Sequence, residues 1–286
     1  MEIKTQTLLK YENLYLEKWD CHRLAAHLQE LACSVSSFGQ KLTIIRTASM
    51  VTLILLCLMD SVRLAAEPIP FRAVYKADYK GLPVSAVGIR ELKRIENGKY
   101  QLSSTAQSFF VSVFEKSIFE LHDQYPLPLE YDYKRTGIGK NRDTTLTFDR
   151  QTGKVVSEQG EWEIEATKGI LDKLSYQYRM REDLKHALKK GQSWPDLNYQ
   201  VADNGRIKTY NFEITGEEFI DTPVGRIKTV KAIRIRKNGG RSTTFWLAPD
   251  YEFLLIRLLQ TEKDGKGFEL LLKEAQFGSQ QVQGLE

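Results

Sequence analysis

Short runs of alternating polar and apolar residues, separated by turn-forming residues, fill most of the chain and limit the folds open to it. Two such runs, 89–95 and 100–106, flank Glu96-Asn97-Gly98-Lys99, where Asn-Gly tolerates the positive φ angles of a tight hairpin turn. The same arrangement recurs over 144–158 and over 254–273. Strands joined in chain order by such turns pair antiparallel, so the pattern predicts a mainly β protein with a meander sheet.

One segment has a helical period. Apolar side chains recur there at spacings near 3.6, at Leu171, Leu174, Tyr178, Leu184 and Leu188. Gly191 stands where a helix would stop, so we predict a helix from about Asp172 to Lys190 with its apolar stripe against the sheet. The expected fold is a curved antiparallel meander sheet or incomplete barrel packed on one α-helix. Its concave face would be lined by tyrosines and by Trp162, Trp194 and Trp246.

An apolar run precedes the β region. Residues 48–59 are apolar except Ser49 and Thr52, and a membrane-spanning helix needs roughly twenty such residues. Basic residues before the run and Ala65-Ala66 after it complete the pattern of a signal peptide over 41–66. We predict cleavage after Ala66, export of the protein, and a mature chain that does not span the membrane.

Residues 1–40 precede the predicted signal peptide, and two interpretations are open. Either Met1 is a wrongly assigned start and translation begins near Lys41, or the segment is a genuine extension. Residues 67–286 are expected to form a single β domain. All three cysteines precede the predicted cut, so this domain must be held by its core without disulfides.

Charge and histidine content limit the chemistry. The formal net charge is +4, and stretches such as Lys231–Lys237 alternate with apolar residues like a solvated strand face, so nucleic-acid binding is not expected. After the predicted cut only His122 and His186 remain, and no Gly-x-Ser-x-Gly elbow is present. We therefore predict no catalytic triad, no metal site and no cofactor.

Acidic side chains give one candidate for catalysis. Glu161, Glu163 and Glu165 share one face of a predicted strand, and paired carboxylates can hydrolyse glycosides. Their alternation with Trp162 and Ile164 favours instead the solvent-facing side of an ordinary strand.

Four residues are the candidate ligand contacts. Asp172, Ser175 and Tyr178 follow one another at three-residue spacing along one side of the predicted helix, facing the hollow of the sheet. Trp246 stands at a predicted strand end. The alternative is structural: Asp172 caps the helix, Ser175 permits close approach, and Tyr178 and Trp246 fill the core.

Three stretches carry a family resemblance: "ILDKLSYQYRMREDL" (170–184), "GEEFIDTPVGRIKTVKAIRI" (216–235) and "FWLAPDYEFLLIRLL" (245–259). They resemble a bacterial exported family known only as a domain of unknown function, with an Asp-x-x-Ser-x-x-Tyr helix, a Thr-Pro-x-Gly turn and a Trp-Leu-x-x-Asp strand end. Leu254-Leu255 departs from the Pro-Val that is usual there. The resemblance implies an antiparallel β fold and a periplasmic or envelope location in a Gram-negative bacterium, and it implies no substrate.

Three functions are compatible with these observations. The favoured one is a non-catalytic envelope protein that binds an amphiphile or an envelope polymer, that is, a lipid or a glycan, on the concave face of its sheet. The second is an assembly partner of other envelope proteins, engaged through a sheet edge. The third is a carboxylate-dependent glycan enzyme.

Overall fold

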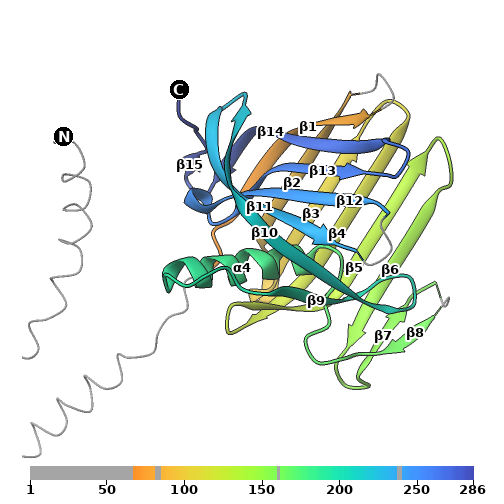
Figure 1. The fold of residues 1–286 in the computed structure, drawn as a ribbon. Helices are drawn as coiled ribbons and strands as arrows, with labels where there is room; N and C mark the ends of the chain where they lie inside the picture. The colour runs from red at the N-terminus through yellow and green to blue at the C-terminus, as the bar shows by residue number, and fades with distance from the viewer. Residues whose placement is uncertain (1–66, 81–84, 160–161, 237–239) are drawn as a thin grey trace, which may run out of the picture. The chain divides into compact units, whose positions relative to one another are not determined.

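The computed structural model describes residues 67–80, 85–159, 162–236 and 240–286 (Figure 1). The predicted extension over 1–40 and the predicted signal peptide over 41–66 lie outside the described residues. Within the described part of the chain, no helix has the length and apolar character needed to cross a bilayer.

The described residues form fifteen strands in one antiparallel sheet. The strands are β1 (Phe71–Lys80), β2 (Ser85–Arg94), β3 (Tyr100–Gln107), β4 (Val111–His122), β5 (Tyr125–Gly137), β6 (Arg142–Asp149), β7 (Lys154–Ser157), β8 (Glu163–Glu165), β9 (Leu197–Ala202), β10 (Ile207–Thr222), β11 (Gly225–Ile235), β12 (Ser242–Ala248), β13 (Leu254–Thr261), β14 (Gly267–Phe277) and β15 (Gln280–Gln281). Two short 3₁₀ turns, η2 (Glu96–Gly98) and η3 (Pro249–Tyr251), lie between strands.

The strand order makes two arms joined at β1. One arm runs from β1 to β8 in chain order, and the other runs from β14 back to β9, with β1 paired to β14. The outer strands β8 and β9 are not paired with each other, so the sheet curves without closing (Figure 1). The predicted meander and incomplete barrel are confirmed.

Local turn chemistry sets the register of the hairpins. Between β2 and β3, Asn97 and Gly98 have φ of 58° and 71°, and the ladder closes with Arg94 opposite Tyr100. Between β10 and β11 the Thr222 hydroxyl donates to the Gly225 carbonyl at 2.7 Å. These turns follow from residues that accept left-handed backbone angles or bond their own backbone.

The helix α4 (Ser175–Lys189) confirms the predicted element. At its start the Asp172 carboxylate accepts the backbone N–H groups of Leu174 at 2.7 Å and Ser175 at 2.8 Å. At its end Gly191 has φ of 59°, and its N–H bonds the Leu188 carbonyl at 3.1 Å while the next N–H bonds Ala187. This is a Schellman arrangement, which satisfies the last carbonyls of a helix.

The predicted apolar stripe is correct except at its last member. Leu171, Leu174, Tyr178 and Leu184 are buried, whereas Leu188 is 51% exposed. In the last turn of α4 the Ala187 side chain packs against the protein, and the Leu188 side chain faces water.

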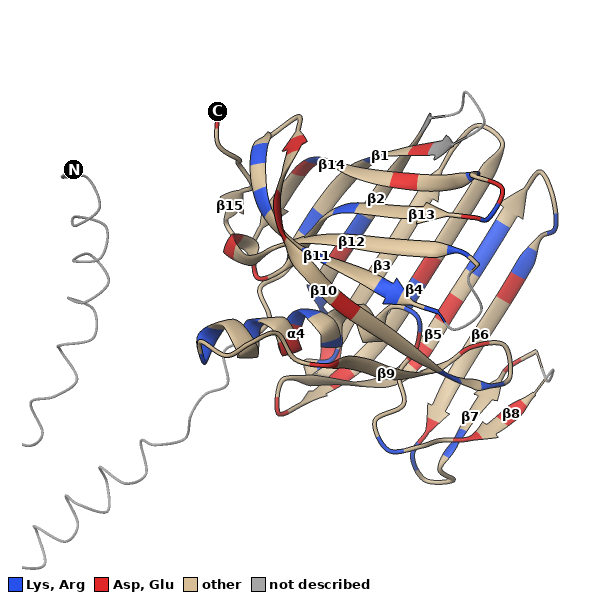
Figure 2. Cartoon of the chain, in the orientation of Figure 1, with Lys and Arg blue, Asp and Glu red and all other residues tan. Residues whose placement is uncertain are grey.

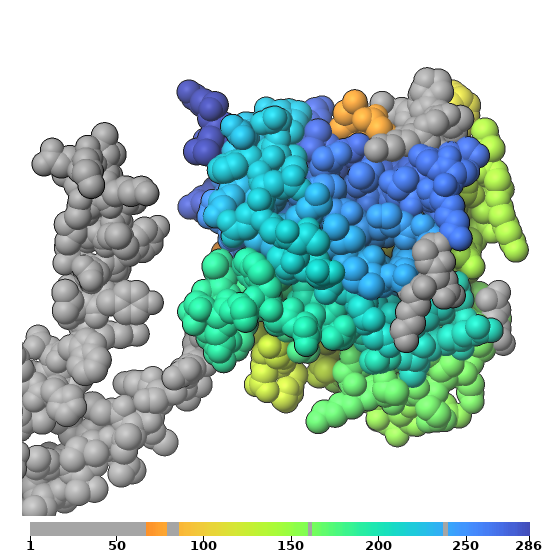
Figure 3. All heavy atoms as spheres, viewed as in Figure 1, coloured from red at the N-terminus to blue at the C-terminus, as the bar shows by residue number. Residues whose placement is uncertain are grey.

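α4 covers one part of the concave face only. Asp172, just before it, lies beside Ser117 in β4, and farther along Arg181 and Lys185 bond Glu252 in the β12–β13 connection. The helix thus runs from the middle of the sheet toward the end where β12 finishes. Figure 1 shows α4 confined to the left of the concave side, and in Figure 3 its atoms and those of β9 pack continuously against the neighbouring strands.

We call the other end of the sheet the distal end. There β3, β5, β11 and β13 finish and β4, β6, β12 and β14 begin. It lies at the right of Figure 1, away from α4.

The space beneath α4 is filled by its own side chains. The Tyr178 ring packs 5.0 Å from that of Phe119, and Tyr176 packs against Tyr199, Tyr210 and Phe212. The cavity left between Tyr178, Phe245 and their neighbours measures about 20 Å³. That volume holds about one water molecule, so an acyl chain has no room beneath the helix.

Candidate functional site

The first predicted cluster lies where α4 begins. Asp172 and Ser175 are fully buried, and the Ser117 hydroxyl of β4 donates to the Asp172 carboxylate at 2.6 Å. Burial raises the pKa of Asp172, while the hydrogen bonds from Ser117 and from the backbone act against that rise. The carboxylate is bonded by Ser117 and by the backbone N–H groups at the start of the helix, as expected of a helix cap.

The structure brings the three predicted helix residues together but not Trp246. Tyr178 lies one turn beyond Ser175, is 1% exposed, and has its pKa raised by burial. Trp246 lies next to Phe245 in β12, and since Phe245 lines the space under α4, the alternation of the strand turns Trp246 to the opposite face.

The expectation that Trp246 lines the concave face is therefore wrong. On its own face the Trp246 indole N–H donates to Glu218, and the ring lies 4.6 Å from the Arg257 guanidinium. Cross-strand pairing with Lys231 and Arg257 holds it there, because strand register decides the face of every side chain. A role for these four residues in ligand binding stays a prediction.

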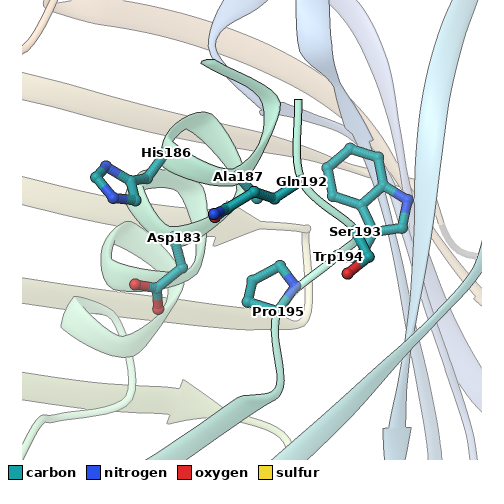
Figure 4. A pocket seen from close by; sticks show the side chains of 7 residues that line it. All are labelled: Asp183, His186, Ala187, Gln192, Ser193, Trp194 and Pro195. Atoms are coloured by element: carbon teal, nitrogen blue, oxygen red, sulfur yellow. The ribbon is translucent and has the colours of Figure 1, made fainter. Parts of the chain in front are cut away.

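A groove lies beside the end of α4 (Figure 4). It measures about 390 Å³, and its lining residues are Asp183, His186, Ala187, Gln192, Ser193, Trp194 and Pro195. Figure 4 shows Asp183 and His186 on the helix, with Trp194 and Pro195 on the segment that follows it. Sequence reasoning missed this groove, and its only signal was a Trp-Pro pair just after the helix stop.

The Asp183 carboxylate in this groove already accepts hydrogen bonds from other side chains. Arg179 donates to Asp183 at 3.0 Å and the Tyr199 hydroxyl donates to it at 3.0 Å. Burial nevertheless raises the pKa of Asp183. The Trp194 ring stands edge-on to Phe253 at 6.1 Å, which ties the groove wall to the core.

Arginines gather at the distal end of the concave face. Arg135 in β5 and Arg142 in β6 stand directly opposite each other in the ladder. From the other arm, Arg234 and Arg236 share one face of β11 and the residues just after it, and Arg241 precedes β12. We call these five residues the arginine cluster, and Figure 2 shows positive segments on both arms at this end.

Charges from the two arms act on the same titratable groups at this end of the sheet. The pKa of Tyr133 in β5 is raised by burial, and Arg135, Arg142 and Arg241 all act to lower it. The pKa of Arg236 is lowered by burial and then by Arg234 and Arg241. The charges of the two arms therefore act on one another across the concave side.

Carboxylates neutralise little of the positive charge of the arginine cluster. In the described part of the chain, only Arg241 among the five pairs with a carboxylate, that of Glu262. Arg135 donates to backbone carbonyls, and the Arg234 guanidinium lies 3.2 Å from the centre of the Tyr210 ring.

Two of its donors are buried without acceptors. Among the described residues, neither Arg234 Nε nor Arg236 Nε has a hydrogen-bond partner. A buried unpaired donor costs about 1–3 kcal/mol, and like charges directly opposite in a ladder, such as Arg135 and Arg142, destabilise it. A bound anion would relieve both effects.

The Glu115 carboxyl group acts on Tyr133, as do arginines of this cluster. Glu115 in β4 has its pKa raised to about 7 by burial, although Lys173 and Arg90 act in the opposite direction. Burial along the strand decreases toward the distal end, from fully buried Ser117 to partly exposed Glu115 and Val113. The concave face is thus closed under α4 and reached by solvent near the arginine cluster.

Sequence reasoning also assigned the wrong face to part of this cluster. Lys231–Lys237 was expected to be a solvated strand face, yet Arg234 and Arg236 are partly buried and Arg234 lies on Tyr210 of the core. The signal that could have revealed the site is the second Arg pair, Arg135 and Arg142, which a hairpin turn brings face to face.

The remaining candidates for chemistry face solvent. Glu163 and Glu165 in β8 are exposed, and Glu163 pairs with Lys154 at 2.7 Å, while Glu161 lies outside the described residues. His122 is exposed beside Asp123. Within the residues that the structure describes, no group of three or more His, Cys, Asp or Glu side chains is placed to hold a metal ion.

These features define a class: an antiparallel, barrel-like β protein with a helix in one part of its concave face and a basic opposite end. The chain belongs to the family described as "Protein of unknown function (DUF3108)", which matches residues 74–273. The resemblance to a family of unknown function is thereby confirmed. The search of curated proteins found no match.

The fold is similar to a solved one from Brucella abortus, described as a β-barrel-like protein of domain of unknown function DUF1849. The TM-score is 0.50 at 10% identity, over 75% of this chain and 100% of that one. Weaker likenesses are to the Pseudomonas aeruginosa MucA/MucB complex (TM-score 0.34, 8% identity, 74% and 52% covered) and to a DUF1329 family protein from Desulfovibrio piger (0.24, 13%, 78% and 90%). At 10% identity the likeness to the Brucella abortus protein concerns the fold alone.

Proposed function

We propose that the protein is an exported envelope protein that binds an anionic amphiphile, without catalysis, at the distal end of its concave face. The observation that carries the proposal is the arginine cluster, in which the described residues supply a carboxylate to only one of five guanidinium groups. Guanidinium groups form their strongest hydrogen bonds with phosphate and carboxylate oxygens. Export rests on the signal-peptide pattern over 41–66.

The surface beside the arginine cluster suits an apolar chain. In register with Arg135 stand Val113, Ala106 and Gly88, all small or apolar, on the three preceding strands. Val113 and Ala106 are partly exposed. A headgroup at the arginines would therefore place its chain on a shallow apolar floor, in the usual arrangement of an apolar site with a few convergent polar groups.

The filled space under α4 moves the proposed site away from the hollow first expected. About 20 Å³ remains there, which excludes a chain of several carbons. The sheet-edge interpretation gains no support, because β8 is a three-residue edge with two exposed glutamates and β9 is bridged by Leu171. The glycan-enzyme interpretation loses support because Glu163 and Glu165 face solvent.

Titration calorimetry with lysophosphatidylglycerol, kept below its micelle concentration, tests the proposal. The full chain is expected to bind it and to bind lysophosphatidylcholine more weakly. The Arg234→Gln/Arg236→Gln variant is expected to bind at least roughly tenfold more weakly, since a hydrogen bond to a charged group contributes about 1.5–3 kcal/mol.

The control is the Arg72→Gln/Arg226→Gln variant, which removes two exposed arginines elsewhere and changes the net charge equally. It should bind like the unmodified chain. Equal affinity of the two double variants would refute the proposed site. The Arg234/Arg236 variant should also be no less stable than the parent without ligand, because it removes uncompensated donors.

A further inference from the structure

Exposed apolar side chains collect at the distal end. Among the described residues, six of the nine exposed large hydrophobic side chains lie there: Val87, Phe109, Phe110, Phe114, Ile138 and Ile235. Phe109 is 96% exposed and Ile138 is 67% exposed, and they stand on two connections, 108–110 between β3 and β4 and 138–141 between β5 and β6. We call these two connections the loop pair.

The loop pair is held by its own hydrogen bonds. The Ile138 N–H donates to the Phe110 carbonyl at 2.9 Å, which joins the two connections. The Ser108 hydroxyl accepts the N–H of Val111 at 3.0 Å, and the Arg135 guanidinium donates to the carbonyls of Ile138 and Lys140. These bonds fix the turns that present Phe109 and Ile138 to water.

A glycine makes this contact possible. Gly137 has φ of 107°, and a Cβ atom there would lie 2.1 Å from the Phe110 carbonyl oxygen. A side chain at this position would force the loops apart. The exposure of the two apolar tips therefore follows from the close approach of two hairpins.

Positive charge surrounds the apolar tips. Lys140 is exposed on the second connection, Arg142 is exposed at the start of β6 directly after it, and Arg135 lies near the end of β5 before it. The acid next to them, Asp143, pairs loosely with Lys134 at 3.9 Å. A protruding apolar tip with exposed cations beside it matches an anionic lipid surface, since each Lys or Arg near such a surface contributes about 1 kcal/mol and the tips bury apolar area among the headgroups.

We propose that the loop pair docks the distal end of the protein onto an anionic lipid bilayer, with Phe109 and Ile138 inserted between headgroups and Lys140 and Arg142 at the phosphates. The inference goes beyond the proposed function and does not rest on it. Docking by this end would turn the arginine cluster toward the membrane surface.

Co-sedimentation of the full chain with vesicles tests the docking. The vesicles contain phosphatidylethanolamine with phosphatidylglycerol, or phosphatidylcholine alone. The variant is Phe109→Ser/Phe110→Ser/Ile138→Ser, and the matched control is Leu188→Ser/Phe219→Ser/Leu285→Ser, which removes three exposed apolar side chains from other places.

The loop variant should partition onto the anionic vesicles roughly a hundredfold more weakly than the control variant, because the apolar side chains at 109 and 138 no longer enter the headgroup region. Phosphatidylcholine vesicles should bind the parent chain more weakly than anionic ones. Equal partitioning of the two triple variants, or equal binding to both vesicle types, would overturn the proposal.

The full chain also contains the apolar run over 48–59, which could bind vesicles by itself. A second measurement, of insertion depth at position 109, reports on the loop pair alone. In a Phe109→Trp variant, brominated lipids should quench additional tryptophan fluorescence relative to the parent chain, whereas a Leu285→Trp variant should show no such increment. Absence of quenching at position 109 would overturn the docking. The loop variant keeps Arg234 and Arg236 and should still bind lysophosphatidylglycerol in solution, so failure of docking and failure of the proposed function are distinguishable.

Discussion

Replacing Glu115 by Gln should stabilise the protein at high pH and not at low pH. Burial raises the pKa of Glu115 from 4.5 to about 7, so the native state keeps a proton on this carboxyl that the unfolded state releases. Between these two values the native state binds more protons, and its stability falls as the pH rises. Gln resembles the protonated carboxyl group at every pH, so the variant avoids this loss.

The magnitude follows from the pKa. A rise from 4.5 to about 7 is equivalent to about 3 kcal/mol, at about 1.4 kcal/mol for each pKa unit. Glu115 keeps partial solvent exposure, and screening by water lowers the expected gain to about 1–2 kcal/mol. The gain should be near zero below about pH 4.5, rise between about pH 4.5 and pH 7, and stay constant above that.

Urea denaturation followed by tryptophan fluorescence, from about pH 4 to pH 8.5, measures this difference in the free energy of unfolding. The control is Glu213→Gln, which removes an exposed carboxylate of β10 and should change stability little at any pH. A Glu115→Gln variant that is destabilised at pH 8, or stabilised equally at all pH values, would refute the assigned ionisation.

Three further substitutions test how the fold is held, each by the same urea denaturation. Asp172→Ala removes the cap of α4 and the bond from Ser117, and should cost about 2–4 kcal/mol. Gly191→Ala places a side chain at φ of 59° and should cost about 1 kcal/mol. Tyr75→Phe leaves the buried Leu255 carbonyl without its 2.8 Å hydrogen-bond donor and should lower the free energy of unfolding by about 1–2 kcal/mol near pH 7. A change below about 0.5 kcal/mol in any of them would contradict the role given to that residue.

Local chemistry made much of the fold predictable. Asn97-Gly98 requires positive φ angles, so the first hairpin follows from two residues. Leu174, Tyr178 and Leu184 repeat at the helical period, and Gly191 stops the helix through its left-handed backbone. These interactions involve residues a few positions apart, which sequence patterns report directly.

The faces of single side chains were less predictable. Trp246 turned to the convex side and Leu188 to solvent, while Arg234 turned toward the core. In a strand, one step of register exchanges the two faces, and register depends on partners far along the chain.

What the sequence determined by itself is the set of elements: an antiparallel meander, one helix with its cap and stop, and the turns between them. What only the tertiary structure decided is where charge and apolar surface meet. Arg135 and Arg241 lie in different arms of the sheet and both act on the pKa of Tyr133, because the sheet curves until its two arms face each other. The curvature, and the choice of α4 to fill one part of the concave face, depend on packing summed over the whole core, which no local pattern contains.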